Sequence, residues 1–305
     1  MQPTLSEFRK YYNVAIHPEL VRLDYERKRL LRYMGLSVVL LGLAIVFAAM
    51  ANAWLVAFLL VLPVLGYMSW LGYQYRQYRQ KFKPHVVGLI LDFLDEDPNI
   101  GLLHYDARRA IDEATFRNSR LFVAHYDIYE GEDFISGTLG SLEFEMSELR
   151  VFERSRVRHT LQTVFRGVFC HAVTSFPTQG KLYLLPRHQE QFLTRTLGSL
   201  AREGLKDVVR ELNDEAFVNA FLIYADRTVR LRKLLVPHFR KEILQYMEET
   251  GKEIYLAFHN QQIYIAVSHD KDLLEPPLWS SVVSFELVRE FYEDLRLLLR
   301  LIEIL

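Results

Sequence analysis

Carboxylate side chains gather in two neighbouring segments that could carry acid–base or metal chemistry. Glu130, Glu132 and Asp133 lie within four positions of one another. The second group is Glu143, Glu145 and Glu148. We predict that residues 130–133 form a turn between two strands, which brings some of these groups together. Carboxylates held close to one another can serve as general acid and base or bind a cation. We favour a solvated strand face, because Glu143 and Glu145 alternate with apolar residues.

The other side chains capable of chemistry form no recognisable motif. The sequence contains neither His-Glu-x-x-His nor Cys-x-x-Cys, so a zinc site has no support. The single cysteine, Cys170, excludes an internal disulfide and is expected to be a buried thiol. Gly131, Gly137 and Gly140 lead into a strand and not into a helix N-terminus, so they predict no phosphate loop. We therefore expect no catalytic residue, no cofactor and no metal ion.

The longest uncharged stretch lies between Arg32 and Arg76. A helix of about 20 residues crosses the hydrocarbon core of a bilayer. Residues 33–51 and 53–72 each approach that length, and Asn52 lies at the natural turning point. We predict a transmembrane hairpin of two helices. Small residues within the first span favour close packing of the hairpin, with dimerisation as the alternative. They are Gly35, Gly42, Ala44, Ala48 and Ala49.

Three other interpretations of this stretch are weaker. Residues 51–53 have the small-x-small pattern of a signal cleavage site, but a removable signal lacks a charged leader of this length and a second span directly after it. A buried soluble hairpin needs a body able to cover helices that are apolar all round. A single long tilted or re-entrant helix is the third.

Basic and aromatic residues flank both spans and predict the membrane interface. Basic residues near span ends remain in the cytoplasm, so a hairpin with basic flanks places both termini there. Tryptophan and tyrosine concentrate at the headgroup level. The predicted interface residues are Arg27, Lys28, Arg29, Arg32, Trp54, Trp70, Tyr73, Arg76 and Arg79.

The rest of the chain predicts an α+β body with a mainly antiparallel sheet flanked by helices. We divide the chain into an amphipathic helical segment (1–32), the hairpin (33–75), a helical stalk and linker (76–120), an α+β domain (121–278) and an amphipathic helix (279–305). The segment 1–32 could lie on the membrane surface or on the body.

Besides the turn at 130–133, short turns predict three further strand hairpins within the body. They join residues 159–176 to 181–185, 217–225 to 229–235, and 254–258 to 262–268. The segment 227–233 carries Arg227, Arg230, Arg232 and Lys233 with apolar residues between them, which predicts a basic strand face towards solvent or, alternatively, towards anionic lipid.

Several short motifs, in this order, resemble a known family. They are Asn118-Ser119-Arg120-Leu121-Phe122, Tyr129-Glu130-Gly131-Glu132-Asp133, Val164-Phe165-Arg166-Gly167-Val168-Phe169, Asn213-Asp214-Glu215-Ala216-Phe217 and the hairpin at 253–267. The chain, up to about residue 278, resembles an uncharacterised family of bacterial inner-membrane proteins with a two-helix anchor and a domain of unknown function. The resemblance implies no activity, but it implies LemA-type membrane proteins as neighbours and partners.

Two functional hypotheses follow. The first is a non-enzymatic, membrane-anchored cytoplasmic module that binds a protein partner, itself or anionic lipid. The second is a membrane-tethered hydrolase that uses carboxylates around Glu132 and Asp133. The formal net charge of −1 provides no global field to attract nucleic acid. Two spans without buried ionisable residues do not favour a channel or transporter.

Overall fold

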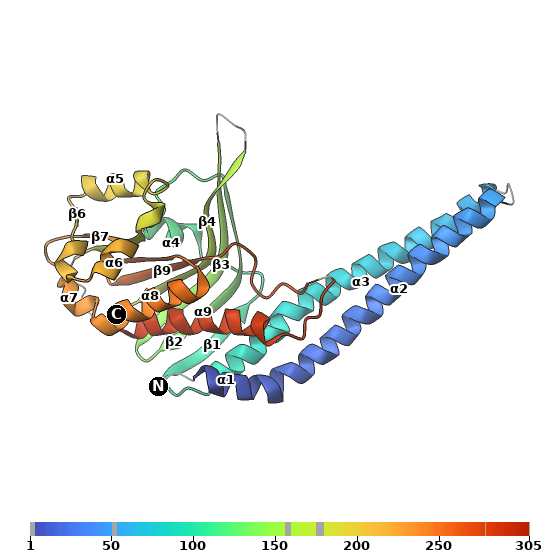
Figure 1. Ribbon diagram of the computed structural model, residues 1–305, viewed down its shortest axis with the longest axis horizontal. Coiled ribbons are helices and arrows are strands. Elements are labelled where there is room, and N and C mark those ends of the chain that lie inside the picture. Colours follow the sequence, from blue (N-terminus) through green and yellow to red (C-terminus); the bar gives the residue numbers. More distant parts are fainter. Residues whose placement is uncertain (1–3, 51–53, 156–159, 175–179, 278, 305) are drawn as a thin grey trace. The chain divides into compact units, whose positions relative to one another are not determined.

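The computed structural model describes residues 4–50, 54–155, 160–174, 180–277 and 279–304 of the chain (Figure 1). These residues form two compact units. The helical unit contains Pro3–Phe93 and Leu274–Phe291. The sheet unit contains Leu94–Leu273 and Tyr292–Leu305. The predicted Asn52 turn lies outside the described residues.

Two long helices dominate the helical unit (Figure 1). The first, α2 (His17–Met50), follows α1 (Leu5–Tyr11) and the short π-helix η1 (Tyr12–Ile16) without a break. The second is α3 (Trp54–Leu94), which extends well beyond the predicted boundary at residue 76. His85 of α3 lies 3.2 Å from Glu19 of α2, and the two residues are equally far in sequence from Asn52. The two helices are therefore antiparallel neighbours.

The apolar part of α2 is exposed to an extent unusual for a helix in water. The large apolar side chains between Tyr33 and Met50 that point outward are 45–85% exposed. In the same stretch Ser37 and Ala48 are buried, at 4% and 2% exposure. Small side chains facing inward and large apolar side chains facing outward are the arrangement of helices packed in lipid. Gly35 and Gly42 face outward, where an added Cβ would contact nothing, so they do not pack the helix pair as predicted.

One helical segment among the described residues, Leu5–Met50, is long and apolar enough to cross a membrane. Core helices of soluble proteins and signal sequences can also meet this criterion. The described residues therefore contain one candidate membrane-spanning helix near the N-terminus. This observation does not establish the second of the two predicted spans.

The N-terminal segment uses its apolar face inside the helical unit. Thr4 caps α1 through a reciprocal capping box with Glu7. Phe8 is fully buried, and its ring lies 5.3 Å from that of Phe93 in α3. The ring of Tyr12 lies 5.0 Å from that of Phe285. Phe8 and Tyr12 of this segment therefore pack on protein, while Val14, Val21 and Tyr25 remain 47–78% exposed.

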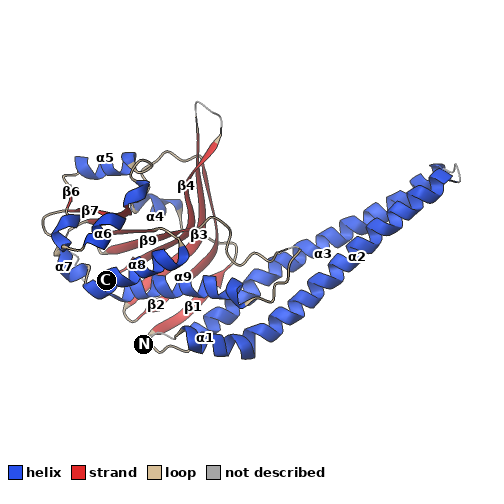
Figure 2. Cartoon of the chain, viewed as in Figure 1, coloured by secondary structure: helices blue, strands red, loops and turns tan. Residues whose placement is uncertain are grey.

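The sheet unit contains a nine-stranded sheet in which all described neighbour pairs are antiparallel (Figure 2). Its order is β1-β2-β3-β4-β9-β8-β5-β7-β6. The strands are β1 (Ile100–Asp106), β2 (Ile128–Leu139), β3 (Leu142–Arg154), β4 (Leu161–Val173), β5 (Leu182–Pro186), β6 (Lys206–Asp207), β7 (Phe221–Ala225), β8 (Ile254–His259) and β9 (Gln262–Ser268). The helices are α4 (Glu113–Asn118), η2 (Arg187–Gln189), α5 (Thr194–Arg202), η3 (Val209–Leu212), α6 (Glu215–Ala220), α7 (Leu231–Leu234), α8 (Pro237–Thr250) and α9 (Phe285–Ile304), whose residues from Tyr292 belong to this unit. The predicted α+β class with a mainly antiparallel sheet is confirmed.

Local signals predicted the second half of the sheet only in part. The hairpin β8–β9 is confirmed, and Asn260 and Gln261 adopt the positive φ values of 52° and 63° that a tight two-residue turn requires. The hairpin predicted for 217–225 and 229–235 is wrong, because α6 precedes β7 and α7 replaces the second strand. The strand β5 pairs with β7 and β8, so its predicted pairing with residues 159–176 is also wrong.

An aromatic core covers one face of the sheet. Phe116 of α4 is its centre, with ring centroids 5.6 Å from Phe122 and 5.1 Å from Phe169. Phe165 and Phe169 lie four positions apart on the same face of β4 and belong to the same cluster. Between them, Gly167 has a φ of 147°, and an added Cβ would lie 2.0 Å from the carbonyl oxygen of Val267. Glycine is therefore required where β4 approaches β9 most closely.

A buried polar cluster joins α8 and α9 in the sheet unit. Asp294 of α9 is 2% exposed and accepts hydrogen bonds from Tyr246 and from the Nζ of Lys252, the latter at 2.7 and 2.8 Å. His269 lies 2.9 Å from the same carboxylate. Burial alone raises the pKa of Asp294, but His269 and Lys252 hold it below its usual range. The cluster fixes the second half of α9 to the rest of the unit.

The β8–β9 hairpin predicts a pH dependence of stability. Burial lowers the pKa of His259, which is 6% exposed, below its unfolded value. The unfolded chain therefore binds a proton more readily, so the stabilising contribution of neutral His259 is lost as the pH falls below about 6.5. We expect the free energy of unfolding to decrease between pH 7 and 5 more steeply for the native protein than for His259→Gln. Denaturant unfolding at several pH values measures this, and equal slopes would contradict it.

Candidate functional site

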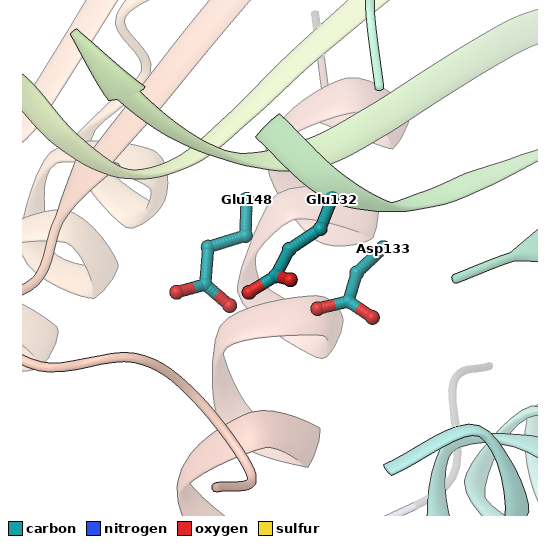
Figure 3. Close-up of side chains that lie close together, drawn as sticks. All are labelled: Glu132, Asp133 and Glu148. Carbon is teal, nitrogen blue, oxygen red and sulfur yellow. The ribbon is translucent and has the colours of Figure 1, made fainter. Parts of the chain in front are cut away.

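A bulge in β2 brings three carboxylates together. Glu132 pairs with Glu148 of β3, but the register then shifts, so that Ile135 pairs with Met146. At the extra residue, Asp133, φ is 59°. A bulge places two consecutive residues on the same side of a strand. Glu132 and Asp133 consequently join Glu148 on one face of the sheet, although neighbours in a regular strand point to opposite faces (Figure 3).

The three carboxylates are close enough to share a ligand. One oxygen of each lies within 4.8 Å of the others, and Asp133 and Glu148 are only 5% and 3% exposed. Tyr105 of β1 donates a hydrogen bond of 2.6 Å to Asp133. The backbone N–H of Leu273 lies 3.4 Å from both oxygens of Glu148. Figure 3 shows the three carboxylate groups pointing the same way from β2 and β3.

Arginines on the adjacent strand residues partly neutralise this acidic cluster (Glu132, Asp133 and Glu148). Arg150 donates to Glu132 at 2.9 Å and lies 3.4 Å from Asp272. Arg166, the cross-strand neighbour of Arg150, donates to Asp272 at 2.8 Å. The acidic cluster therefore continues into an ion-pair network that ties β2, β3 and β4 to the segment before Leu273. Such a network stabilises the local structure whether or not a ligand binds.

The chemistry available at the acidic cluster is that of oxygen ligands. Carboxylate oxygens are the ligands that Ca²⁺ and Mg²⁺ prefer. Burial, followed by the charge of Asp133, raises the pKa of Tyr105, so that its phenol remains a hydrogen-bond donor at neutral pH. Proximity of these carboxylates to His104, His125 or His171 would favour acid–base catalysis, but these three histidines lie elsewhere. His171 lies on the opposite face of the sheet and contacts Glu145 at 3.0 Å, while His104 and His125 are exposed.

The sequence located two of these carboxylates but gave the wrong reason for their proximity. Residues 130–133 were predicted to form a turn, whereas they lie inside β2 and the chain reverses at Gly140, where φ is 60°. Glu130 is exposed, outside the acidic cluster. Glu148 was treated as part of a solvated strand face, yet it is buried. No local signal indicated the bulge, because a Glu-Gly-Glu-Asp segment is equally typical of a turn.

The predicted interface residues divide into one buried ion pair and a set of exposed groups. Arg27, one of the predicted membrane-interface residues, is only 2% exposed and donates to Asp24 at 2.8 Å. Asp24 also accepts from the backbone N–H of Val282 at 3.2 Å and lies 2.8 Å from the Nζ of Lys28. This buried carboxylate joins α2 to the segment that precedes α9.

The remaining described interface residues face outward from the helical unit. The exposed basic residues are Lys28, Arg29, Arg32, Arg76 and Arg79. Trp70 and Tyr73 are 52% and 57% exposed, and Trp70 stacks on Tyr67 at 5.7 Å. The side chain of Trp54 lies outside the described part of the structure. The exposed set has the composition of a headgroup-level belt.

The basic residues at 227–233 do not form a strand face. Arg227, Arg230, Arg232 and Lys233 are exposed, but Arg227 lies in a turn, Arg230 directly precedes α7, and Arg232 and Lys233 lie in α7. Arg232 donates to the backbone carbonyl of Glu211 at 3.1 Å. A helical turn spreads these side chains around its axis, so the alternation that predicted one charged face does not apply.

Comparison with known proteins assigns no activity. Residues 163–305 match the family model described as "Protein of unknown function (DUF3137)". This match includes α9, which the resemblance drawn from the sequence did not reach, and it does not extend to the N-terminal helices. No curated protein matches the chain.

One solved structure shares a weak likeness with the chain: the crystal structure of the mycobacterial trehalose monomycolate transport factor A, TtfA. It is 9% identical, with a TM-score of 0.26, over 64% of this chain and 88% of that one. At this TM-score the likeness supports no structural or functional argument.

Because Asp24 is buried in an ion pair with Arg27, we expect its neutralisation to reduce stability much more than neutralisation of Glu19, another carboxylate of α2. In Asp24→Asn, the buried Arg27 loses its ion pair with Asp24, and removing one partner of a buried ion pair costs about 3 kcal/mol or more. In Glu19→Gln, two half-exposed pairs are lost, at a cost of about 1 kcal/mol or less. Thermal unfolding of the detergent-solubilised chain measures the difference. Equal melting temperatures for the two variants would show that Arg27 finds solvent easily.

Proposed function

We propose that this protein is a membrane-anchored binding or scaffolding module of the bacterial inner membrane. In this proposal residues 33–51 and 53–72 are two spans, and both termini lie in the cytoplasm. One observation carries the proposal: the outward apolar side chains of residues 33–50 are 45–85% exposed. A continuous apolar surface of this kind is stable in lipid and promotes aggregation in water.

The orientation rests on the basic residues at both ends of the apolar stretch. Lys28, Arg29 and Arg32 precede the first span, and Arg76 and Arg79 follow the second. All five are exposed and available to the cytoplasmic headgroups. Because such residues resist translocation, a hairpin with this distribution keeps both flanks on the cytoplasmic side.

Binding, and not catalysis, is the activity that the sheet unit supports best. The acidic cluster is tied to Arg150 and lacks the three histidines that would complete a general acid–base site. The binding partner in this proposal is a protein, a second copy of the chain or anionic lipid. A LemA-type membrane protein, implied by the sequence resemblance, is one partner to test.

Cross-linking in native membranes tests the proposal. We expect the tagged full-length protein to be captured with a near-stoichiometric partner, identified by mass spectrometry or as a differently tagged second copy. A matched variant replaces residues 33–75 with two unrelated spans. If the body carries the binding surface, this variant retains the partner.

Two outcomes would contradict the proposal. Recovery of the chain in the soluble fraction after cell breakage would remove the membrane anchor. Capture of a single copy without any partner, from both the native chain and the span-swapped variant, would remove the binding function.

The acidic cluster supports a second candidate function, a hydrolase that uses Glu132, Asp133 and Glu148, because their oxygens lie within 4.8 Å of one another. The binding-module proposal predicts that Ca²⁺, Mg²⁺ or Mn²⁺ changes the melting temperature of the native protein and of Glu148→Gln equally. Glu143→Gln, an exposed carboxylate on the same strand, is the matched control. A cation-dependent stabilisation lost only in Glu148→Gln would favour the hydrolase.

A further inference from the structure

An exposed tryptophan follows the sheet in a segment for which the sequence predicted no role. Trp279 is 84% exposed, although tryptophan is among the most buried side chains on average. It belongs to the strap, which we define as residues 274–277 and 279–284 of the helical unit. Tryptophan side chains that are neither buried nor in water characteristically lie at the headgroup level of a bilayer, where the ring is in an apolar region and the N–H is hydrated.

The strap is held on both sides of Trp279. Glu275 lies 3.4 Å from Arg79 of α3. The backbone N–H of Val282 donates to Asp24 of α2 at 3.2 Å, and Val282 itself is fully buried. Pro276 is also buried. Figure 1 shows the strap as a dark red segment that bends along α3. The strap therefore contacts α3 before Trp279 and α2 after it.

Both anchor points lie close to the predicted ends of the spans. Arg79 follows residue 72 by seven positions, and Asp24 precedes residue 33 by nine. At 1.5 Å per helical residue these separations are about 10 and 13 Å along the helices. The headgroup layer adds roughly 5–8 Å on each side of the hydrocarbon core. Four residues of extended chain reach up to about 13 Å, which is enough for Trp279 to enter that layer from Glu275.

Charge complements the aromatic side chain at this level of the helical unit. Lys28 and Arg79 have side chains 57% and 55% exposed, and Arg29, Arg32 and Arg76 are exposed as well. We call these five residues the basic collar. The acidic groups of the same region are Asp24, which is buried in its ion pairs, Glu26, which is half-buried, and Glu275, which pairs with Arg79. Exposed basic residues near an anionic membrane surface are attracted to it electrostatically.

We infer that the strap is a lipid-contacting element: Trp279 inserts into the headgroup layer of the bilayer that the hairpin spans, beside anionic headgroups bound by the basic collar. This inference rests on the proposed membrane anchoring and adds a second, non-spanning contact to it. The bilayer fits the surface because it offers an apolar–polar boundary for the indole and negative charge for the collar at the same depth.

Single-tryptophan variants of the full chain test the inference, because the sequence has only three tryptophans, Trp54, Trp70 and Trp279. The test variant, Trp54→Phe with Trp70→Phe, retains Trp279. The anchor control, Trp70→Phe with Trp279→Phe, retains Trp54. The solvent control lacks all three native tryptophans and carries Phe192→Trp, at a position of the sheet unit that is also 84% exposed.

The variants are reconstituted into vesicles of phosphatidylcholine and phosphatidylglycerol in which the phosphatidylcholine is brominated near the carbonyl end of its chains. We expect the emission of Trp279 to be quenched at least twofold and to lie at shorter wavelength than that of the solvent control. Replacing the anionic phosphatidylglycerol with phosphatidylcholine removes the negative charge of the bilayer surface. The quenching of Trp279 should then decrease, because the basic collar no longer binds anionic headgroups.

The controls separate the two proposals. If Trp54 is quenched while Trp279 behaves like the solvent control, the strap inference is overturned and the anchor survives. If neither Trp54 nor Trp279 is quenched in vesicles that carry the protein, both the membrane anchor and the strap inference are overturned. If Trp279 is quenched equally with and without phosphatidylglycerol, the role of the basic collar is overturned and the aromatic contact stands.

Discussion

The absence of charge between Arg32 and Arg76 is the constraint on which the rest of the helical unit depends. Large apolar side chains point outward from residues 33–50 at 45–85% exposure, and small residues such as Ser37 and Ala48 are buried in their place. A soluble helix pair has the opposite distribution, with large apolar residues inside. The same constraint explains why charge begins abruptly at both ends of the stretch.

Next to that stretch, a buried ion pair between Asp24 and Arg27 stabilises the helical unit. Asp24 compensates Arg27 and receives the backbone N–H of Val282, so one carboxylate satisfies groups from two distant segments. A buried carboxylate needs such partners, because its desolvation would otherwise exceed any gain from packing. The aromatic contacts of Phe8 with Phe93 and of Tyr12 with Phe285 pack the N-terminal end of the same unit. The position of the strap follows from these contacts.

The sheet unit combines an aromatic core on one face with polar clusters that fix its edges and its helices. Phe116 and its neighbours provide most of the aromatic contacts, and the Asp294 cluster orders α9. The acidic cluster occupies the bulge of β2, where the backbone deviates from a regular strand. Bulges concentrate near functional sites in many proteins. In this chain the arginine network beside the bulge compensates part of the negative charge.

The sequence by itself determined those features that depend on neighbouring residues. The α+β class, the β8–β9 hairpin with Asn260 and the long apolar helix all follow from local periodicity and turn chemistry. Tertiary structure alone decided the burial of Arg27, the bulge that gathers the carboxylates and the exposure of Trp279. Each of these depends on a partner far away in sequence, such as Val282, Tyr105 or Arg79. A local pattern cannot specify such a partner, because the energy of the contact exists only after the segments have met.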